Sequence, residues 1–189
     1  MGIKVISKKI IDSTNDHAKR VLKKHPELLN DGFLVIADQQ TNGKGTHGKS
    51  WYSKSSGGLY YTLGFIPKEF DFNSIESYHL QISKCIQHSI QRLTGVTVEI
   101  RYPNDLYLKN KKIGGILMES EMSSGPTQKL DFLIIGIGLN INQTSFPSSL
   151  MDKATSLHLE TKTTYQKLKL VKPITKQLFQ LFNHPIIES

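Results

Sequence analysis

The apolar positions of this 189-residue chain form several short runs of the kind found in strands and one long stretch with helical spacing. Between positions 74 and 93 an apolar side chain recurs every three or four residues, which predicts an amphipathic helix with one buried face. The pattern is carried by Ile75, Tyr78, Ile82, Ile86, Ile90 and Leu93. This stretch is the clearest helix in the sequence.

The short apolar runs predict a set of strands. They span residues 3–11, 33–37, 59–65, 96–102, 105–108, 113–122 and 130–141. Strands that surround one long helix without strict strand–helix alternation favour an α+β fold with a mixed, largely antiparallel sheet flanked by helices. No linker or repeat interrupts the chain, so we expect residues 1–189 to form a single domain.

Two further helices are expected near the ends of the chain. Four residues of the N-cap type, Asp12 to Asn15, precede a helix expected over about 15–24. The tail is expected to be helical from about residue 165. Because a proline costs about 3 kcal/mol inside a helix, we expect a break or kink at Pro173.

The charge balance points to anionic partners. The 24 Lys and Arg residues outnumber the 16 Asp and Glu residues and give a formal net charge of +8. The basic residues are scattered rather than interleaved with aromatic ones, so nucleic-acid binding is not expected. The single cysteine, Cys85, excludes an internal disulfide framework. Without a long apolar stretch or signal-peptide pattern, the sequence predicts a cytoplasmic protein with no membrane span.

The segment 41–51, with the sequence TNGKGTHGKSW, is a candidate ligand loop. Glycines allow backbone N–H groups to approach an anion closely, and lysines neutralise it, so the composition favours a phosphate-bearing ligand. A flexible basic loop is the alternative, because the spacing of a P-loop is missing.

Three other segments leave room or polar groups beside the expected sheet. Residues 101–105 place a cation, an amide and a carboxylate around a proline, which by themselves are typical of a simple turn. Glycines interrupt the apolar runs at 114–115 and at 136 and 138. Glycine within a strand indicates a bulge or the close approach of another group, of which a ligand is one.

Five motifs, taken together and in order, resemble biotin protein ligase, the biotin–[acetyl-CoA-carboxylase] ligase family. They are DSTN at 12–15, the glycine loop at 40–51, YPNDLY at 102–107, KIGGIL at 112–117 and GIGLNI at 136–141. The resemblance covers roughly residues 5–160 and implies the catalytic-domain fold of that family, which is similar to class II aminoacyl-tRNA synthetases. Neither the N-terminal DNA-binding domain nor the C-terminal β-barrel of some members is expected.

The resemblance implies a reaction in two steps. Biotin and ATP form biotinyl-adenylate, and a lysine of a biotin carboxyl carrier protein, or of such a domain in a carboxylase, then takes the biotinyl group. ATP with Mg²⁺ is therefore the expected cofactor. A lipoate-type ligase or acyltransferase of the same fold is one alternative, and a biotin-binding protein with weak ligase activity is another.

The resemblance also implies roles for individual residues. The residues that it implies for biotin binding are Ser13, Thr14, Asn15, Gln40, Trp51, Tyr60, Gly115, Gly136 and Gly138. Adenylate or ATP binding falls on Gly43, Lys44, Gly45, Thr46, Asn104, Lys112 and Asn140. Catalytic roles fall on Lys112, Asp105 and Arg101. Lys112 would hold carboxylate and phosphate oxygens as charge builds, while Asp105 would either activate the acceptor lysine or bind Mg²⁺.

The glycine loop departs from the family, which usually has arginines where this chain has Lys44 and Thr46. Arginine grips phosphate with two parallel hydrogen bonds, whereas lysine is a point charge. We therefore expect a weaker hold on the adenylate unless another cation substitutes. The oligomeric state stays open, although pairing of edge strands is one route to a homodimer.

Overall fold

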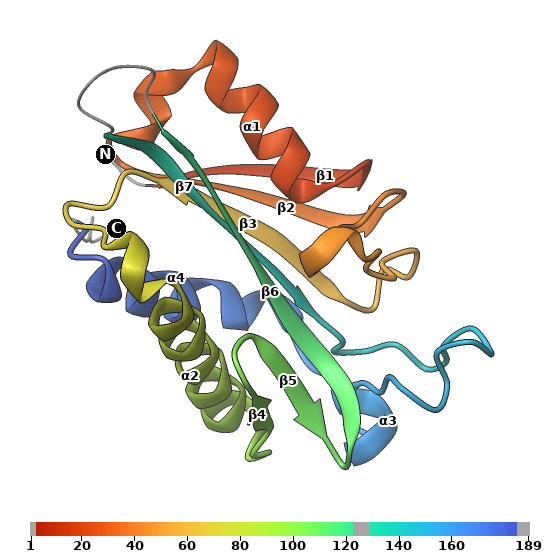
Figure 1. Ribbon diagram of the computed structural model, residues 1–189. Helices are drawn as coiled ribbons and strands as arrows, with labels where there is room; N and C mark the ends of the chain where they lie inside the picture. Colours follow the sequence, from red (N-terminus) through yellow and green to blue (C-terminus); the bar gives the residue numbers. More distant parts are fainter. Residues whose placement is uncertain (1–2, 123–128, 185–189) are drawn as a thin grey trace.

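A computed structural model describes residues 3–122 and 129–184 (Figure 1). In this part of the chain seven strands form one sheet in the order β1-β2-β3-β7-β6-β5-β4. The strands are β1 (Lys4–Ile11), β2 (Phe33–Gln40), β3 (Leu59–Phe65), β4 (Glu99–Arg101), β5 (Asp105–Leu108), β6 (Lys111–Met122) and β7 (Leu130–Leu139). Strands β1 and β2 are parallel, and every other neighbouring pair is antiparallel. The predicted α+β fold with a largely antiparallel sheet is confirmed.

Helices cover both faces of the sheet (Figure 1). Helix α1 (Thr14–Lys24) lies on one face, against β2, β3 and β7. Helices α2 (Ile75–Thr94) and α4 (Val171–Leu181) lie together on the other face. Both α1 and α2 have sequence-encoded ends: Ser13 caps α1 by accepting a hydrogen bond from the Asp16 N–H, and Gly95 ends α2 in the left-handed conformation.

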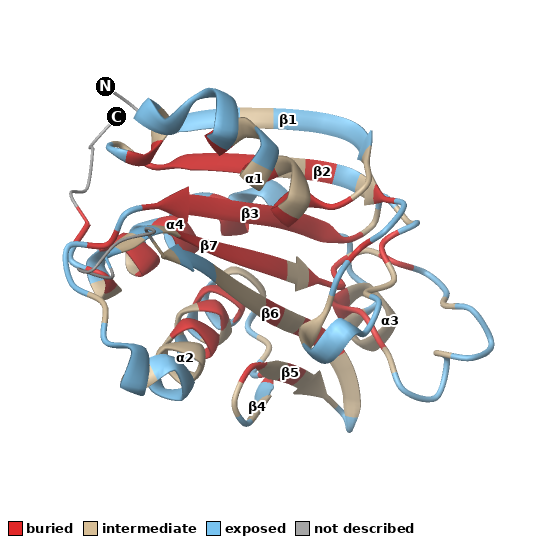
Figure 2. Cartoon of the chain, turned by 45° about the horizontal axis from the view of Figure 1, so that its top comes forward, coloured by how far each residue is buried: buried red, intermediate tan, exposed pale blue. Residues whose placement is uncertain are grey.

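Each face of the sheet has its own apolar core. The helical face predicted over 74–93 packs on the α4 side, where Ile82, Ile86 and Ile90 are fully buried. On the other side Ala18 and Leu22 of α1 pack against alternate residues of β2 and β7. Strand β3 is buried along its whole length between these layers, whereas β1 is a largely exposed edge (Figure 2). Polar residues near β3 therefore sit at the centre of the molecule.

Three local expectations are corrected by the structure. The strand expected at 96–102 covers only Glu99–Arg101. Pro173 does not break a helix: it is the third residue of α4, in the first turn, where proline is tolerated. The change of helix type comes earlier, where the 3₁₀ turn Lys167–Leu170 meets α4. Helix α3 (Leu157–Thr161) was not expected, because five residues are too few for a periodic pattern.

Strands β5 and β6 are joined by a tight hairpin turn. Lys109 and Asn110 both adopt positive φ angles, of 47° and 66°, as a tight hairpin turn requires. In the part of the chain that the structure describes, no helix has both the length and the apolar character needed to cross a membrane.

Candidate functional site

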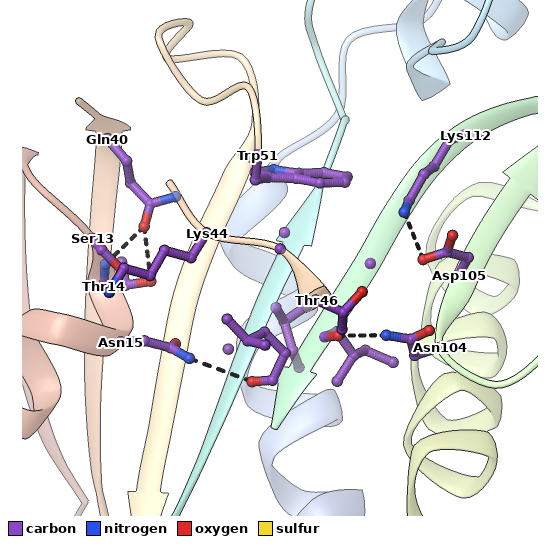
Figure 3. Close-up of a pocket in the computed structure, with 17 residues that line it drawn as sticks. Ser13, Thr14, Asn15, Gln40, Lys44, Thr46, Trp51, Asn104, Asp105 and Lys112 are labelled. Carbon is purple, nitrogen blue, oxygen red and sulfur yellow. Dashed lines mark hydrogen bonds and ion pairs between the residues drawn. The ribbon is translucent and has the colours of Figure 1, made fainter. Parts of the chain in front are cut away.

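Most of the predicted site residues line one narrow cavity, where the start of α1, the glycine loop and strands β5 to β7 meet (Figure 3). The predicted residues that line it are Ser13, Thr14, Asn15, Gln40, Lys44, Gly45, Thr46, Trp51, Asn104, Asp105, Lys112, Gly115, Gly136 and Gly138. Ile116, Leu117 and Ile137 complete the wall, and sequence reasoning did not single them out. Figure 3 shows Ser13, Thr14, Asn15 and Gln40 on one side of the cavity, and Asn104 with the Lys112–Asp105 pair on the other.

Gln40, the last residue of β2, is held in one orientation. Its side-chain oxygen accepts hydrogen bonds from the Thr14 N–H at 2.7 Å and from the Thr14 hydroxyl at 3.1 Å. Its amide nitrogen donates to the Ser53 hydroxyl at 3.1 Å. All three residues are buried, so this amide ties the start of α1 to the sheet and to the glycine loop. Ser53 was missed by sequence reasoning.

Asn15, in the first turn of α1, is also bonded at both ends of its amide. Its oxygen accepts from the Thr62 hydroxyl at 2.6 Å, and its nitrogen donates to Glu119 Oε2 at 2.7 Å. A longer bond of 3.4 Å joins the same nitrogen to the Leu117 carbonyl. Sequence reasoning missed both side-chain partners. Thr62 is the one aliphatic hydroxyl residue in β3, whose other residues are apolar or aromatic, and this is the signal that would have found it.

The glycine loop folds back on itself and carries Trp51 to the roof of the cavity. Lys44 and Ser50 form a short antiparallel bridge, and the Trp51 N–H donates to the Gly43 carbonyl at 2.8 Å. The Trp51 ring lies against Gly138, where a Cβ would be only 2.6 Å from the indole nitrogen. That nitrogen is buried and has no hydrogen-bond partner among the described residues. It is a donor available to a ligand.

Lys112 and Asp105 form an ion pair beside the Trp51 ring. Their Nζ and Oδ1 atoms are 2.6 Å apart, and both side chains are about 30% exposed. Lys112 Nζ also lies 5.5 Å from the centre of the Trp51 ring. Antiparallel pairing of β5 with β6, with an irregularity after Leu106, brings the two residues together. The pair places a cation and a carboxylate at one point of the cavity wall.

A larger cavity of about 460 Å³ adjoins the first and shares Lys112 and Trp51 with it. Gly43 and Asn140, both predicted to bind the nucleotide, line this second cavity. Its wall also contains Lys49, Lys54 and Lys153. Asp105 is the only acidic residue among the described residues that line the two cavities. The second cavity is therefore suited to an anion.

Lys44 is engaged with α1. Its Nζ lies 2.8 Å from Asp16 Oδ1, and this hydrogen bond raises the pKa of Lys44. The ion pair fastens the glycine loop to the helix. The Asp16 carboxylate also neutralises part of the positive charge of Lys44, which the sequence analysis expected to act on a phosphate.

Arg101 and Tyr60 line neither cavity. The Arg101 guanidinium lies 3.9 Å from the centre of the Tyr107 ring and donates to Asn110 at 2.9 Å. The Tyr60 hydroxyl donates to the Ser55 carbonyl at 3.1 Å, and burial raises the pKa of Tyr60. Both positions stabilise the surroundings of the site, so neither enters the proposal below as a residue that touches the ligand.

The described residues do not form a metal site from protein side chains alone. Within residues 3–122 and 129–184, no three His, Cys, Asp or Glu side chains come close enough together to hold a metal ion. A cation at this site would need oxygen ligands supplied by a bound substrate.

Known proteins resemble this chain in both sequence and structure. The chain is 32% identical over 159 residues to the bifunctional ligase/repressor BirA of Bacillus spizizenii, a match that covers 83% of this chain and 47% of that protein. It is 27% identical over 130 residues to the biotin–[acetyl-CoA-carboxylase] ligase of Mycobacterium tuberculosis, over 67% of this chain and 45% of that protein. The chain thus spans about half the length of the curated relatives it matches.

A solved structure shares the fold at similar identity. The biotin protein ligase of Aquifex aeolicus in complex with biotin and ATP superimposes with a TM-score of 0.75 and 31% identity, over 95% of this chain and 72% of that chain. Residues 7–140, which contain every residue predicted for the site, match the sequence pattern of a known family. The chain belongs to the Biotin/lipoate A/B protein ligase family.

Proposed function

We propose that this chain ligates biotin to a lysine of a biotin carboxyl carrier protein or carrier domain, using ATP and a biotinyl-adenylate intermediate. The observation that carries the proposal is the position of Lys112, which among the described residues is the one lysine that lines both the narrow cavity and the basic cavity beside it. A group at that point is suited to hold two anionic reactants together.

In the proposal, the narrow cavity takes the biotin ring system. The ureido head of biotin needs both donors and acceptors, and Thr14, Asn15 and Gln40 supply them at one end. Ile116 and Ile137 provide apolar contact for the rest of the molecule. The Aquifex protein, whose structure contains biotin and ATP, supports this choice of ligands.

The second cavity takes ATP. Lysines 49, 54 and 153 provide positive charge for its phosphates, and the Trp51 ring offers a flat surface at the boundary between the two ligands. Mg²⁺ enters with ATP and prefers carboxylate and phosphate oxygens. Asp105, the one carboxylate among the described residues of the two cavity walls, fits that requirement and lies next to Lys112.

In the first step, a carboxylate oxygen of biotin attacks the α-phosphorus of ATP. The new O–P bond forms as the bond to the β-phosphate bridging oxygen breaks, and pyrophosphate leaves. Lys112 stabilises the negative charge that the carboxylate and α-phosphate oxygens share in the transition state.

In the second step, the ε-amine of the carrier lysine attacks the carbonyl carbon of the adenylate. A C–N bond forms, the C–O bond to AMP breaks, and the nitrogen loses a proton. Asp105 is the carboxylate nearest to Lys112 and has two compatible roles, as the acceptor of that proton or as an oxygen ligand for Mg²⁺.

The test is to incubate the protein with ATP, Mg²⁺ and either biotin or lipoate, and to measure pyrophosphate and acyl-adenylate. We expect pyrophosphate release that depends on biotin, and transfer of biotin to an added carrier domain. Release with lipoate but not with biotin would assign the chain to the lipoate branch of the family instead. Tight binding of biotin without pyrophosphate release would leave a binding protein and refute the ligase.

A further inference from the structure

Glu119, a half-buried residue of β6, is a charged side chain that directly contacts a residue lining the narrow cavity without lining that cavity itself. Its Oε2 atom accepts a hydrogen bond of 2.7 Å from the Asn15 amide nitrogen. Its Oε1 atom lies 2.5 Å from Lys19 Nζ, one helical turn beyond Asn15 on α1. Both carboxylate oxygens of Glu119 therefore contact side chains of α1.

These contacts determine which way round the Asn15 amide lies. An asparagine amide is nearly symmetric in shape, so its orientation depends on its hydrogen-bond partners. The nitrogen faces two acceptors, the Glu119 carboxylate and the Leu117 carbonyl, while the oxygen faces a donor, the Thr62 hydroxyl. In the reversed orientation the amide oxygen would face two acceptors and lose both bonds.

Of the two acceptors, Glu119 constrains the Asn15 amide more strongly. Its bond is charge-assisted and 2.7 Å long, whereas the bond to the Leu117 carbonyl is 3.4 Å long. With the amide held this way, the Asn15 oxygen lies against Gly136, another residue of the cavity wall. A Cβ at Gly136 would be 2.2 Å from that oxygen, which shows how closely the amide is seated.

We propose that Glu119 is a positioning residue for biotin recognition: it fixes the Asn15 amide with its oxygen at the cavity wall, so that Asn15 serves as an acceptor for a ligand N–H group. This inference rests on the proposed function, because biotin is the ligand whose ureido group offers such a donor. Glu119 acts through Asn15 and does not touch the ligand.

Biotin affinity, measured by calorimetry, tests the first consequence. Glu119→Ala should weaken biotin binding about tenfold, the usual effect of losing one hydrogen bond to a charged group. Two matched controls should leave the affinity within about twofold of the wild type. Glu121→Ala makes the same change two residues along β6 at an exposed position, and Lys19→Met removes the ion pair while keeping the Asn15 contact. Equal losses in Glu119→Ala and Lys19→Met would overturn the proposal.

A double-mutant cycle tests whether Glu119 acts through Asn15. In an Asn15→Ala background, Glu119→Ala should cause no further loss of biotin affinity. The same tenfold loss in both backgrounds would show that Glu119 acts by another route and would refute the inference. Thermal unfolding of each variant identifies any loss that comes from the fold.

Side-chain amide exchange in the unliganded protein provides a readout that does not need biotin. Exchange of the Asn15 amide protons with solvent should be faster in Glu119→Ala than in wild type and unchanged in Lys19→Met. Unchanged exchange in Glu119→Ala would overturn the positioning role even if biotin binds. If the wild-type chain does not bind biotin, the proposed function fails, and the exchange rates alone decide whether Glu119 positions Asn15.

Discussion

The replacement of Gly138 by alanine should disable the site while leaving the fold almost intact. A Cβ at this position would lie 2.6 Å from Trp51 Nε1 and 2.8 Å from Cε2. Since favourable carbon contacts begin at about 3.5 Å, the indole ring has to move by about 1 Å. Trp51 is half-buried at the end of a loop, so the ring yields more easily than the β7 backbone does.

The expected cost falls mainly on catalysis. A displacement of about 1 Å in a group that positions reactants can reduce the rate by about 10²-fold. The free energy of unfolding should fall by about 1 kcal/mol, at the low end of the range for overpacking, because the Trp51 ring can shift outward. Trp51 lines both cavities, so the loss should appear with both biotin and ATP.

Gly115 provides a matched control, because it pairs directly with Gly138 across β6 and β7. A Cβ at Gly115 would find its nearest neighbours at 3.5 Å, which is ordinary contact. Adenylation measured by pyrophosphate release should fall about 100-fold in Gly138→Ala. The fluorescence of Trp51, the single tryptophan of the sequence, should change in Gly138→Ala and stay as in the wild type in Gly115→Ala. Equal fluorescence in the two variants would refute the reasoning that Gly138 is required for the position of Trp51.

Three further predictions concern charges. Lys112→Ala should slow adenylate formation by about 10²- to 10³-fold, the usual loss for one donor at a developing charge, with the melting temperature unchanged; an unchanged rate would show that the lysine is only a hairpin surface residue. Thr46→Arg should slow dissociation of the adenylate by about tenfold, because one added charge-assisted hydrogen bond is worth roughly 1.5 kcal/mol or more; an unchanged dissociation rate would mean that other cations already hold the phosphate. The Arg20 guanidinium lowers the pKa of Asp12 from 3.8 to about 2, so this pair stabilises the fold above about pH 4 and ceases to do so as pH falls through 2. Arg20→Ala should accordingly lower the free energy of unfolding by less than about 1 kcal/mol at pH 6, since the pair is exposed, and denaturant titrations should find a much smaller difference at pH 2; a constant difference over this range would contradict the pairing.

The sequence by itself determined the elements and the chemical content of the site. The spacing of apolar residues predicted the long helix α2 and most strands. A helix or strand with one buried face repeats its apolar residues with a period that is characteristic of that element. The order of the five motifs was sufficient to identify the family. The same local information failed at Pro173, where the cost of proline depends on its position within the helix, and at Glu99–Arg101, where only part of an apolar run finds a strand partner.

Only the tertiary structure decided how these residues meet. Asn15 is joined to Thr62, 47 positions away, and to Glu119, 104 positions away, and no local pattern records such contacts. Gly115 and Gly138 look alike in sequence and both face the Trp51 ring, yet a Cβ would lie 2.6 Å from the ring at Gly138 and 3.5 Å from it at Gly115. Arg101 and Asp105 are direct partners across β4 and β5, yet Asp105 pairs with Lys112 whereas the Arg101 side chain extends to Tyr107 and Asn110. The reason is physical: local periodicity reports which face of an element is buried, whereas strand order and register determine what that face touches.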